Sequence, residues 1–418
     1  MPTATAGSTA LDALFTSEGR ADPYPHYGVL REHARVLTVT DGLLLVSGHA
    51  ELEAALRHPQ LEVHDAEFNA RYRPGIAGLP SISVFADSML MGRSPGHERV
   101  RRLVSGAFTP RRLHTLTDQI RSSAVELAAR LERHCVEDGA GDFMAEVAYP
   151  LPLRVIGDLL GVPRQDLAWF RPLVSDLAKT MDPQLTPKLL DAADLAAVDL
   201  LAYFDQLVAE RRRQPRQDMV SALVEVHDSE DGRLSDSELR ANLVLMFVAG
   251  FETTANLLGN ALSLLLDHSD HAAALRADPA AYVQEVLRFD SPIQITGRWA
   301  VSDLEFAGVQ VPEGSNLMLL LGAGNRDPRR FDAPDTFDPG RADNRPLSFG
   351  SGPHYCLGAA LARMEAQIAL PLVLDRLPRL RRAAPAVRGE WLTVRGYASL
   401  PVGVTEAAPE TTPEATQT

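Results

Sequence analysis

The chain has 418 residues, 45% of them hydrophobic, and a formal net charge of −14 at pH 7. This length and apolar content are enough for one large core or for two or three domains. The acidic balance argues against nucleic acid or an anionic membrane surface as a partner.

Cysteine usage and the absence of long apolar runs indicate the cellular location in which we expect the protein. Cys135 and Cys356 are the only two cysteines, so a disulfide framework is not indicated and we expect a cytoplasmic protein. The first residues lack the basic start and apolar core of a signal peptide. No run approaches 18 uninterrupted apolar residues, so we expect no membrane span.

The two ends of the chain differ in composition from the rest. We expect residues 1–20 to form a disordered segment, and residues 405–418 to form a disordered tail rich in Thr, Pro and acidic residues. No long linker or internal repeat interrupts residues 21–404, which we predict to be a single domain.

The first predicted elements are short. A helix is expected from Asp22 to Ala34, a hairpin over 36–46 around Asp41-Gly42, and a short helix over 49–57. Residues 66–93 lack periodicity and are predicted to be a long loop of the kind that often carries function. Its apolar residues Val84 and Phe85 are candidates to line a substrate pocket; simple packing beneath the loop is the alternative.

Most of the middle of the chain has helical periodicity, and strand-like runs are few. The patterns predict a mainly α fold with small β-sheets. A helix begins at Ser94-Pro95, a cap followed by proline. Further helices are predicted over 117–136, 145–160, 167–179, 188–213 and 217–227, and strands over 304–311, 316–321 and 391–404.

The longest helix is predicted from Ser235 to about Asp267, where Ser235 and Glu238 have the spacing of a capping box. Such an apolar helix is expected to be buried. The polar residues Glu252 and Thr253 lie at its centre, and local inconsistencies of this kind are typical of functional sites. A helix bend with a solvated glutamate is the alternative.

A ten-residue stretch from Phe349 to Gly358 contains Cys356 where a glycine-rich loop turns into a helix. Backbone N–H groups and the helix dipole favour anionic sulfur at such a position. A single cysteine does not indicate a four-ligand zinc site, whereas one soft axial ligand suits haem iron. A glycine-rich loop with a buried structural cysteine is the alternative.

This stretch resembles the haem-binding loop of the cytochrome P450 family, in which a Phe-Gly pair, a second glycine, a histidine, the cysteine and a glycine follow one another. The resemblance extends from about Asp22 to Val404. It implies the cytochrome P450 fold with haem b between the long central helix and the helix after Cys356, the iron ligand.

The resemblance also assigns roles to residues elsewhere. Glu252 and Thr253 match the family pair that delivers protons to dioxygen, and Glu285, Arg288 and Arg341 match a buried structural trio. On its own, the i, i+3 pair of Glu285 and Arg288 is more typical of a solvated surface. Residues implied to contact the cofactor are His97, Arg101, Ala249, Arg298, Phe349, His354 and Gly358. Residues implied to line the substrate pocket are Val84, Phe85, Leu245, Val248, Ile293, Ile295 and Tyr397.

The family resemblance implies a haem-thiolate monooxygenase that inserts one oxygen atom from O2 into a hydrophobic organic substrate, by hydroxylation or epoxidation. A secondary metabolite is the candidate substrate class. The chain has no flavin- or nicotinamide-binding segment, so electrons are expected from a separate ferredoxin and its reductase. A peroxygenase or oxidative-coupling enzyme and a non-catalytic haem-binding protein are the alternatives. Arginines suggested as the ferredoxin surface are Arg99, Arg101, Arg102, Arg111, Arg112 and Arg363.

Overall fold

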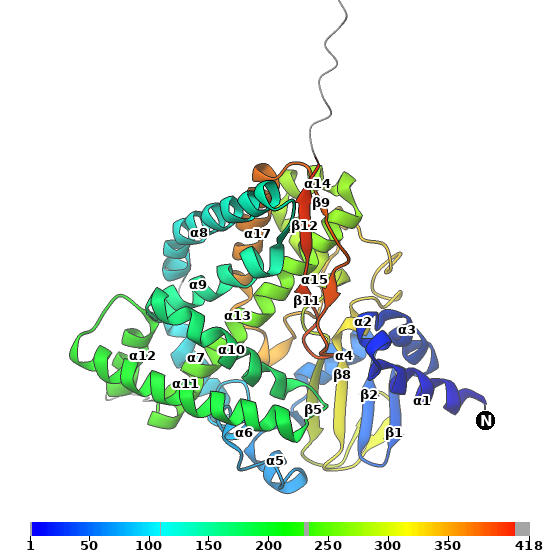
Figure 1. Cartoon of the computed structure of the whole chain (residues 1–418). Coiled ribbons are helices and arrows are strands. Elements are labelled where there is room, and N and C mark those ends of the chain that lie inside the picture. Colours follow the sequence, from blue (N-terminus) through cyan, green and yellow to red (C-terminus); the bar gives the residue numbers. More distant parts are fainter. Residues whose placement is uncertain (1, 109, 230–233, 406–418) are drawn as a thin grey trace, which may run out of the picture.

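The computed structural model describes residues 2–108, 110–229 and 234–405. Helices occupy most of the molecule, and one mixed sheet lies to the side of them (Figure 1). This confirms the prediction of a mainly α fold with small sheets. Almost all of the predicted tail, 405–418, lies outside the described residues.

The amino-terminal segment, predicted to be disordered over 1–20, is instead helical. It forms α1 (Pro2–Leu14) and α2 (Ser17–Ala21), and the Thr16 hydroxyl caps α2 by accepting the N–H of Gly19 at 3.0 Å. The prediction was wrong because Leu11 and Leu14 are buried in a core cluster with residues of the sheet, a contact that local composition does not report.

The main sheet has the strand order β1-β2-β8-β5-β3. The predicted hairpin is confirmed as β1 (Val36–Thr40) and β2 (Leu43–Val46), and β2 pairs in parallel with β8 (Asn316–Leu320). The remaining two strands are β5 (Ile295–Ala300), which was not predicted, and β3 (Leu61–Glu62).

The smaller sheets come mainly from the last third of the chain. The predicted strand over 304–311 is a hairpin of β6 (Leu304–Phe306) and β7 (Val309–Val311). The predicted strand over 391–404 is broken, because only β11 (Tyr397–Ser399) and β12 (Pro401–Val404) are extended. Their partners are β4 (Gly141–Asp142), β9 (Leu380–Arg382) and β10 (Val387–Arg388).

The predicted helices are confirmed, with ends that move by a few residues. They are α3 (Tyr24–His33), α4 (His49–Arg57), α7 (Gly96–Ala107), α8 (Pro110–Glu137), α9 (Pro150–Leu160), α10 (Leu167–Ala178), α11 (Pro187–Arg213) and α12 (Met219–Asp228). The predicted loop over 66–93 is partly helical. It contains α5 (Ala66–Tyr72), capped by the side chain of Asp65, and α6 (Pro80–Ser83).

The central helix is α13 (Asp236–Asp267), and its predicted capping box of Ser235 and Glu238 is present. It runs through the middle of the molecule (Figure 1) and packs against α9, α10 and α17 (Ala359–Arg376). Within the described residues it is the one helix long and apolar enough to cross a membrane, but 78% of its most apolar window is buried inside the protein. It is therefore a core helix here. The remaining helices are α14 (Ala272–Ala277), α15 (Pro279–Phe289) and α16 (Leu321–Gly324).

Candidate functional site

One turn of α13 is open although the helix around it is buried. Val248 and Phe251 are fully enclosed, whereas Ala249 is exposed and Thr253 is partly exposed. The Thr253 hydroxyl donates to the carbonyl of Ala249, one turn earlier, at 2.8 Å. The small side chain of Ala249 and the hydroxyl of Thr253 therefore share one accessible face in the middle of the molecule.

The loop before α17 brings Cys356 to the surface of a tight turn. Gly350 and Gly352 adopt left-handed backbone angles, with φ of 71° and 69°, and the Cys356 N–H donates to the carbonyl of Phe349 at 2.9 Å. A side chain at Gly352 would meet the backbone of Leu56 at 2.9 Å, so this turn requires glycine. The loop thereby presents an exposed thiol.

The electrostatic surroundings of Cys356 differ from the expectation of an intrinsically anionic sulfur. The side chain is accessible on one side, yet the surrounding protein raises the pKa of the thiol. The backbone N–H groups of Gly358 and Ala359 and the charges of Arg101 and Arg363 act in the opposite direction but do not outweigh this burial. A coordinating metal deprotonates a thiol, so bound haem iron would hold this sulfur as a thiolate.

Cationic and ring-nitrogen side chains come together from three segments of the chain, and His97 and Arg298 among them are buried. His97 of α7 stacks on His354 of the Cys loop, with ring centroids 4.0 Å apart. His97 is 2% exposed, and neither ring nitrogen has a hydrogen-bond partner. Arg298 of β5 is also buried, and Arg101 donates to the carbonyl of Tyr355 at 2.6 Å.

These groups destabilise one another's charged forms. Burial lowers the pKa of Arg298 to about 10, with Glu62 acting in the opposite direction. Burial, and then the neighbouring His97, Arg298 and Arg101, lower the pKa of His354 to about 3. Buried donors without acceptors are costly. The cluster therefore fits a partly buried anion, and the two propionates of haem b would supply the missing acceptors.

The residues predicted as a structural trio do meet. Glu285 and Arg288 are both fully buried, and two N–H groups of Arg288 donate to the carboxylate at 2.7 and 2.8 Å. Arg341 lies 3.4 Å from the same carboxylate. Arg288 also donates to the carbonyls of Asn325, Pro334 and Thr336 at 3.1, 2.7 and 2.9 Å. The trio therefore fixes the segment that leads into the Cys loop.

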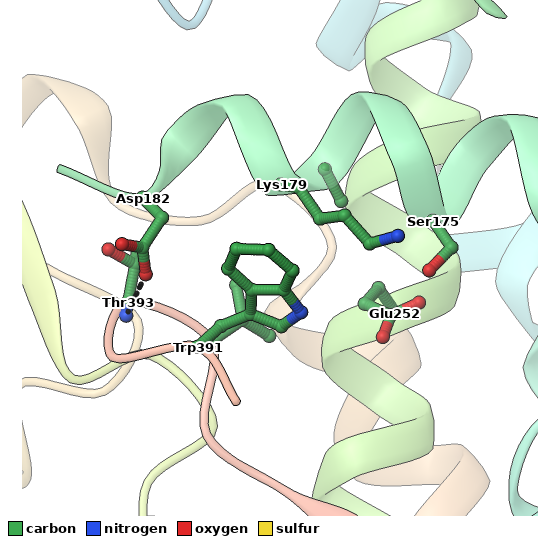
Figure 2. Close-up of a pocket in the computed structure, with 8 residues that line it drawn as sticks. Ser175, Lys179, Asp182, Glu252, Trp391 and Thr393 are labelled. Atoms are coloured by element: carbon green, nitrogen blue, oxygen red, sulfur yellow. Dashed lines mark hydrogen bonds between the residues drawn. The ribbon is translucent and has the colours of Figure 1, made fainter. Parts of the chain in front are cut away.

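Glu252 does not share the accessible face of Thr253. Its carboxyl points into a separate pocket of about 20 Å³ beneath the end of α10 (Figure 2). One carboxyl oxygen is buried without a hydrogen-bond partner. Burial raises the pKa of this carboxyl, and Arg171 and Lys179 partly oppose the shift.

Sequence reasoning missed the other residues of this pocket, because no motif marks them and they come from segments more than 200 residues apart. Besides Glu252, the lining residues are Ser175, Ala178, Lys179, Asp182, Trp391, Thr393 and Val394.

The predicted substrate-lining residues are only partly brought together. Val84, Phe85, Leu245 and Val248 share one large core cluster. Tyr397 belongs to the same cluster, but its hydroxyl hydrogen-bonds to Ser263, ten residues and about 15 Å along α13 from Thr253.

The two isoleucines predicted for the pocket lie in other clusters. Ile295 packs with Tyr27 and Leu30, and Ile293 packs against the cluster under the main sheet. Phe349 is half-buried against the large cluster, with the guanidinium of Arg363 over its ring at 4.4 Å. Of the seven predicted residues, Val84, Phe85, Leu245, Val248 and Tyr397 therefore share one cluster, and the two isoleucines do not.

Comparisons with known proteins identify the family of the chain. The family model for cytochrome P450 matches residues 170–279 and 280–378. The chain is 36% identical to the biotin biosynthesis cytochrome P450 of Bacillus subtilis, over 90% of this chain and 94% of that protein. It is 34% identical to the 6-deoxyerythronolide B hydroxylase of Saccharopolyspora erythraea, over 94% of this chain and 99% of that protein.

Solved structures show the same architecture. A crystal structure of P450BioI in complex with an acyl carrier protein that carries hexadec-9Z-enoic acid is similar, with a TM-score of 0.84 and 34% identity. The match covers 93% of this chain and 100% of the other. The chain therefore belongs to the cytochrome P450 family of haem b monooxygenases.

Proposed function

We propose that the protein binds haem b between α13 and α17, with Cys356 as iron ligand, and inserts one oxygen atom from O2 into a hydrophobic organic substrate. The observation that carries this proposal is the cluster of His97, Arg298 and His354, in which both buried ring nitrogens of His97 lack a hydrogen-bond partner and burial lowers the pKa of Arg298. When bound, the haem activates O2, and its thiolate ligand favours cleavage of the O–O bond.

We assign proton delivery to Thr253 and Glu252. The Thr253 hydroxyl is accessible, and its bond to the carbonyl of Ala249 can be exchanged for a bond to a ligand by rotation of one side-chain angle. Burial raises the pKa of the Glu252 carboxyl, so this carboxyl holds a proton more readily than an exposed glutamate does. Both residues act on protons and neither forms a bond to substrate.

We propose a hydrophobic secondary metabolite as the substrate class. Val84, Phe85, Leu245 and Val248 are apolar and share one core cluster, and Val248 directly precedes Ala249 of the accessible turn of α13. The relative from Saccharopolyspora erythraea is named as a hydroxylase of 6-deoxyerythronolide B. These two observations support an apolar substrate but do not select one compound.

We propose that electrons come from a separate, acidic ferredoxin in the cytoplasm. Arg101 and Arg363 lie close enough to Cys356 to lower the pKa of its thiol, and the neighbouring Tyr355 is 41% exposed. Arg99 contributes less than the sequence suggested, because it pairs with Glu238 of α13. The side chain of Arg111 lies outside what the structure describes.

The experiment is a substrate screen by the shift of the ferric Soret band, followed by turnover of each binding compound. We expect turnover with a ferredoxin, its reductase and O2, and little turnover with hydrogen peroxide alone. Thr253→Ala should lower the product formed per electron pair several-fold, whereas Thr254→Ala, a matched change at the next residue, should not. Folded protein that holds no haem, or equal coupling in both variants, would overturn the proposal.

A further inference from the structure

The pocket that holds the Glu252 carboxyl is closed by a segment from the end of the chain, residues 391–395. Asp182, just after α10, accepts the backbone N–H groups of Leu392 and Thr393 at 2.9 and 3.2 Å. The hydroxyl of Thr393 donates back to the carbonyl of Met181 at 3.2 Å. This double attachment, which we call the Asp182 clamp, holds Trp391 over the pocket (Figure 2).

The pocket has the size and chemistry for one water molecule. Its volume of about 20 Å³ exceeds the ~10–15 Å³ that a single water requires. Figure 2 shows the Lys179 ammonium, the Ser175 hydroxyl and the indole nitrogen of Trp391 near the Glu252 carboxyl. These groups supply the polar partners that an internal water needs, and Glu252 has an oxygen without a partner.

Lys179 is placed to connect this pocket with solvent. Its ammonium pairs with Asp176 at 2.6 Å and is 29% exposed. The same ammonium lies 5.7 Å from the centre of the Trp391 ring. It therefore lies between the half-exposed carboxylate of Asp176 on one side and the pocket of Glu252 on the other.

The closing segment is also joined to the stretch that precedes β5. The N–H of Gln294 donates to the carbonyl of Thr393 at 3.0 Å, and the N–H of Arg395 donates to the carbonyl of Pro292 at 2.7 Å. Ile293 and Val394 form an antiparallel bridge between these bonds. Because β5 continues to Arg298, these contacts join residues 391–395 to the strand that carries one member of the cofactor cluster.

We propose that residues 391–395 form a gate on the proton supply of Glu252, held shut by the Asp182 clamp with Trp391 as the lid. In the closed state one pocket water joins Glu252 to Lys179. After Glu252 gives its proton toward Thr253, the carboxylate regains one from this water, which takes its own from solvent at Lys179. Ligand binding near 292–298 shifts the gate. The inference rests on the proposed role of Glu252.

The charged and titratable groups that face Glu252 are Arg171 of α10, Lys179 directly after it, Asp182, which lines the same pocket, and Tyr149 before α9. None of them belongs to the closing segment. Trp391→Ala therefore changes the solvation of the carboxyl without removing a charge from its surroundings, whereas Asp182→Ala also removes a carboxylate from the pocket lining.

The test uses the haem-loaded protein with Trp391→Ala, which removes the lid, and Asp182→Ala, which removes the clamp. Trp169→Ala is the matched control, because Trp169 is 42% exposed on the same helix that borders the pocket and does not line it. The carboxyl band of Glu252, assigned by its loss in Glu252→Gln, is followed by infrared titration and by hydrogen–deuterium exchange.

In both gate variants the proton of the Glu252 carboxyl should exchange several-fold faster than in wild type, and the pKa of this carboxyl should lie closer to the ordinary range. Both quantities should be unchanged in the control, Trp169→Ala. Unaltered exchange and titration in both would overturn the gate. The fluorescence of Trp391 is isolated as the difference between wild type and Trp391→Phe. Its quenching by acrylamide should change when a bound compound shifts the Soret band. Unchanged quenching would overturn the proposed link between residues 292–298 and the gate.

The two proposals fail in different ways. If Glu252→Gln leaves the product formed per electron pair unchanged, the assigned role of Glu252 is wrong, and the gate on its proton supply falls with it. Suppose instead that Glu252→Gln lowers the product formed per electron pair, while the gate variants keep the wild-type yield and the wild-type exchange and titration of the carboxyl. Only the gate is then wrong. If Trp391→Ala does not fold, Trp391→Leu takes its place, because its smaller side chain covers less of the pocket while keeping some apolar packing.

Discussion

Replacing Glu285 by alanine should destabilise the fold by about 3–5 kcal/mol, the usual cost of leaving one member of a buried ion pair uncompensated. The carboxylate accepts two bonds from Arg288, one from the N–H of Asp338 at 2.8 Å and one from Asn344 at 2.9 Å. Arg288 is fully buried. Its three carbonyl partners remain in Glu285→Ala, but the charge is no longer neutralised.

Urea unfolding followed by far-ultraviolet circular dichroism measures this loss. The matched control is Glu53→Ala, which breaks the i, i+4 pair with Arg57 on α4. Both side chains of that pair are largely exposed, 44% and 60%, so its removal should cost about 0.3–0.5 kcal/mol. A loss below about 1 kcal/mol in Glu285→Ala would refute the reasoning, because Arg288 would then have found solvent or another partner.

Three further predictions follow from the site. Cys356→Ser should abolish the thiolate signature of the reduced carbon monoxide complex while Cys135→Ser keeps it; a normal spectrum in Cys356→Ser would remove the ligand assignment. Arg298→Gln should release haem to apomyoglobin several-fold faster, and an unchanged rate would mean that Arg298 does not hold the propionates. Burial and then the charge of Arg73 lower the pKa of His64 to about 4. Because the unfolded chain then binds more protons, stability should fall as the pH decreases from about 6.5 toward 4, by at most about 3 kcal/mol. His64→Gln should flatten that slope in urea unfolding at several pH values, and a slope as steep as wild type would rule out His64 as its source.

The parts of the site that could be predicted from the sequence are those fixed by local geometry. The capping box at Ser235 determines where α13 begins, and left-handed glycines shape the loop before Cys356. Glu285 and Arg288 are one helical turn apart, so their contact follows from spacing alone. Their burial does not, since an identical spacing on a surface helix would leave both side chains in water.

The elements that were missed depend on distant partners. Strand β5 contains Gly297 and Arg298, which interrupt any apolar alternation, and it is extended because it pairs with β8 along its length. Helix α1 is ordered because its apolar side chains meet the sheet. In both cases the stabilising contacts come from residues far along the chain, so a window of neighbouring residues carries no signal for them.

Glu252 and Thr253 show most clearly where local reasoning stops. The two residues are adjacent, but successive residues of an α-helix point about 100° apart, so one faces the accessible turn and the other faces α10. The Thr253 hydroxyl is bonded to its own helix, and the Glu252 carboxyl has an oxygen without a partner. Neither side chain is bonded to the other, so proton transfer between them requires rotation of the glutamate or an intervening water. The packing of α10 and residues 391–395 around Glu252 sets the cost of that rotation, and this packing is what the sequence motif does not contain.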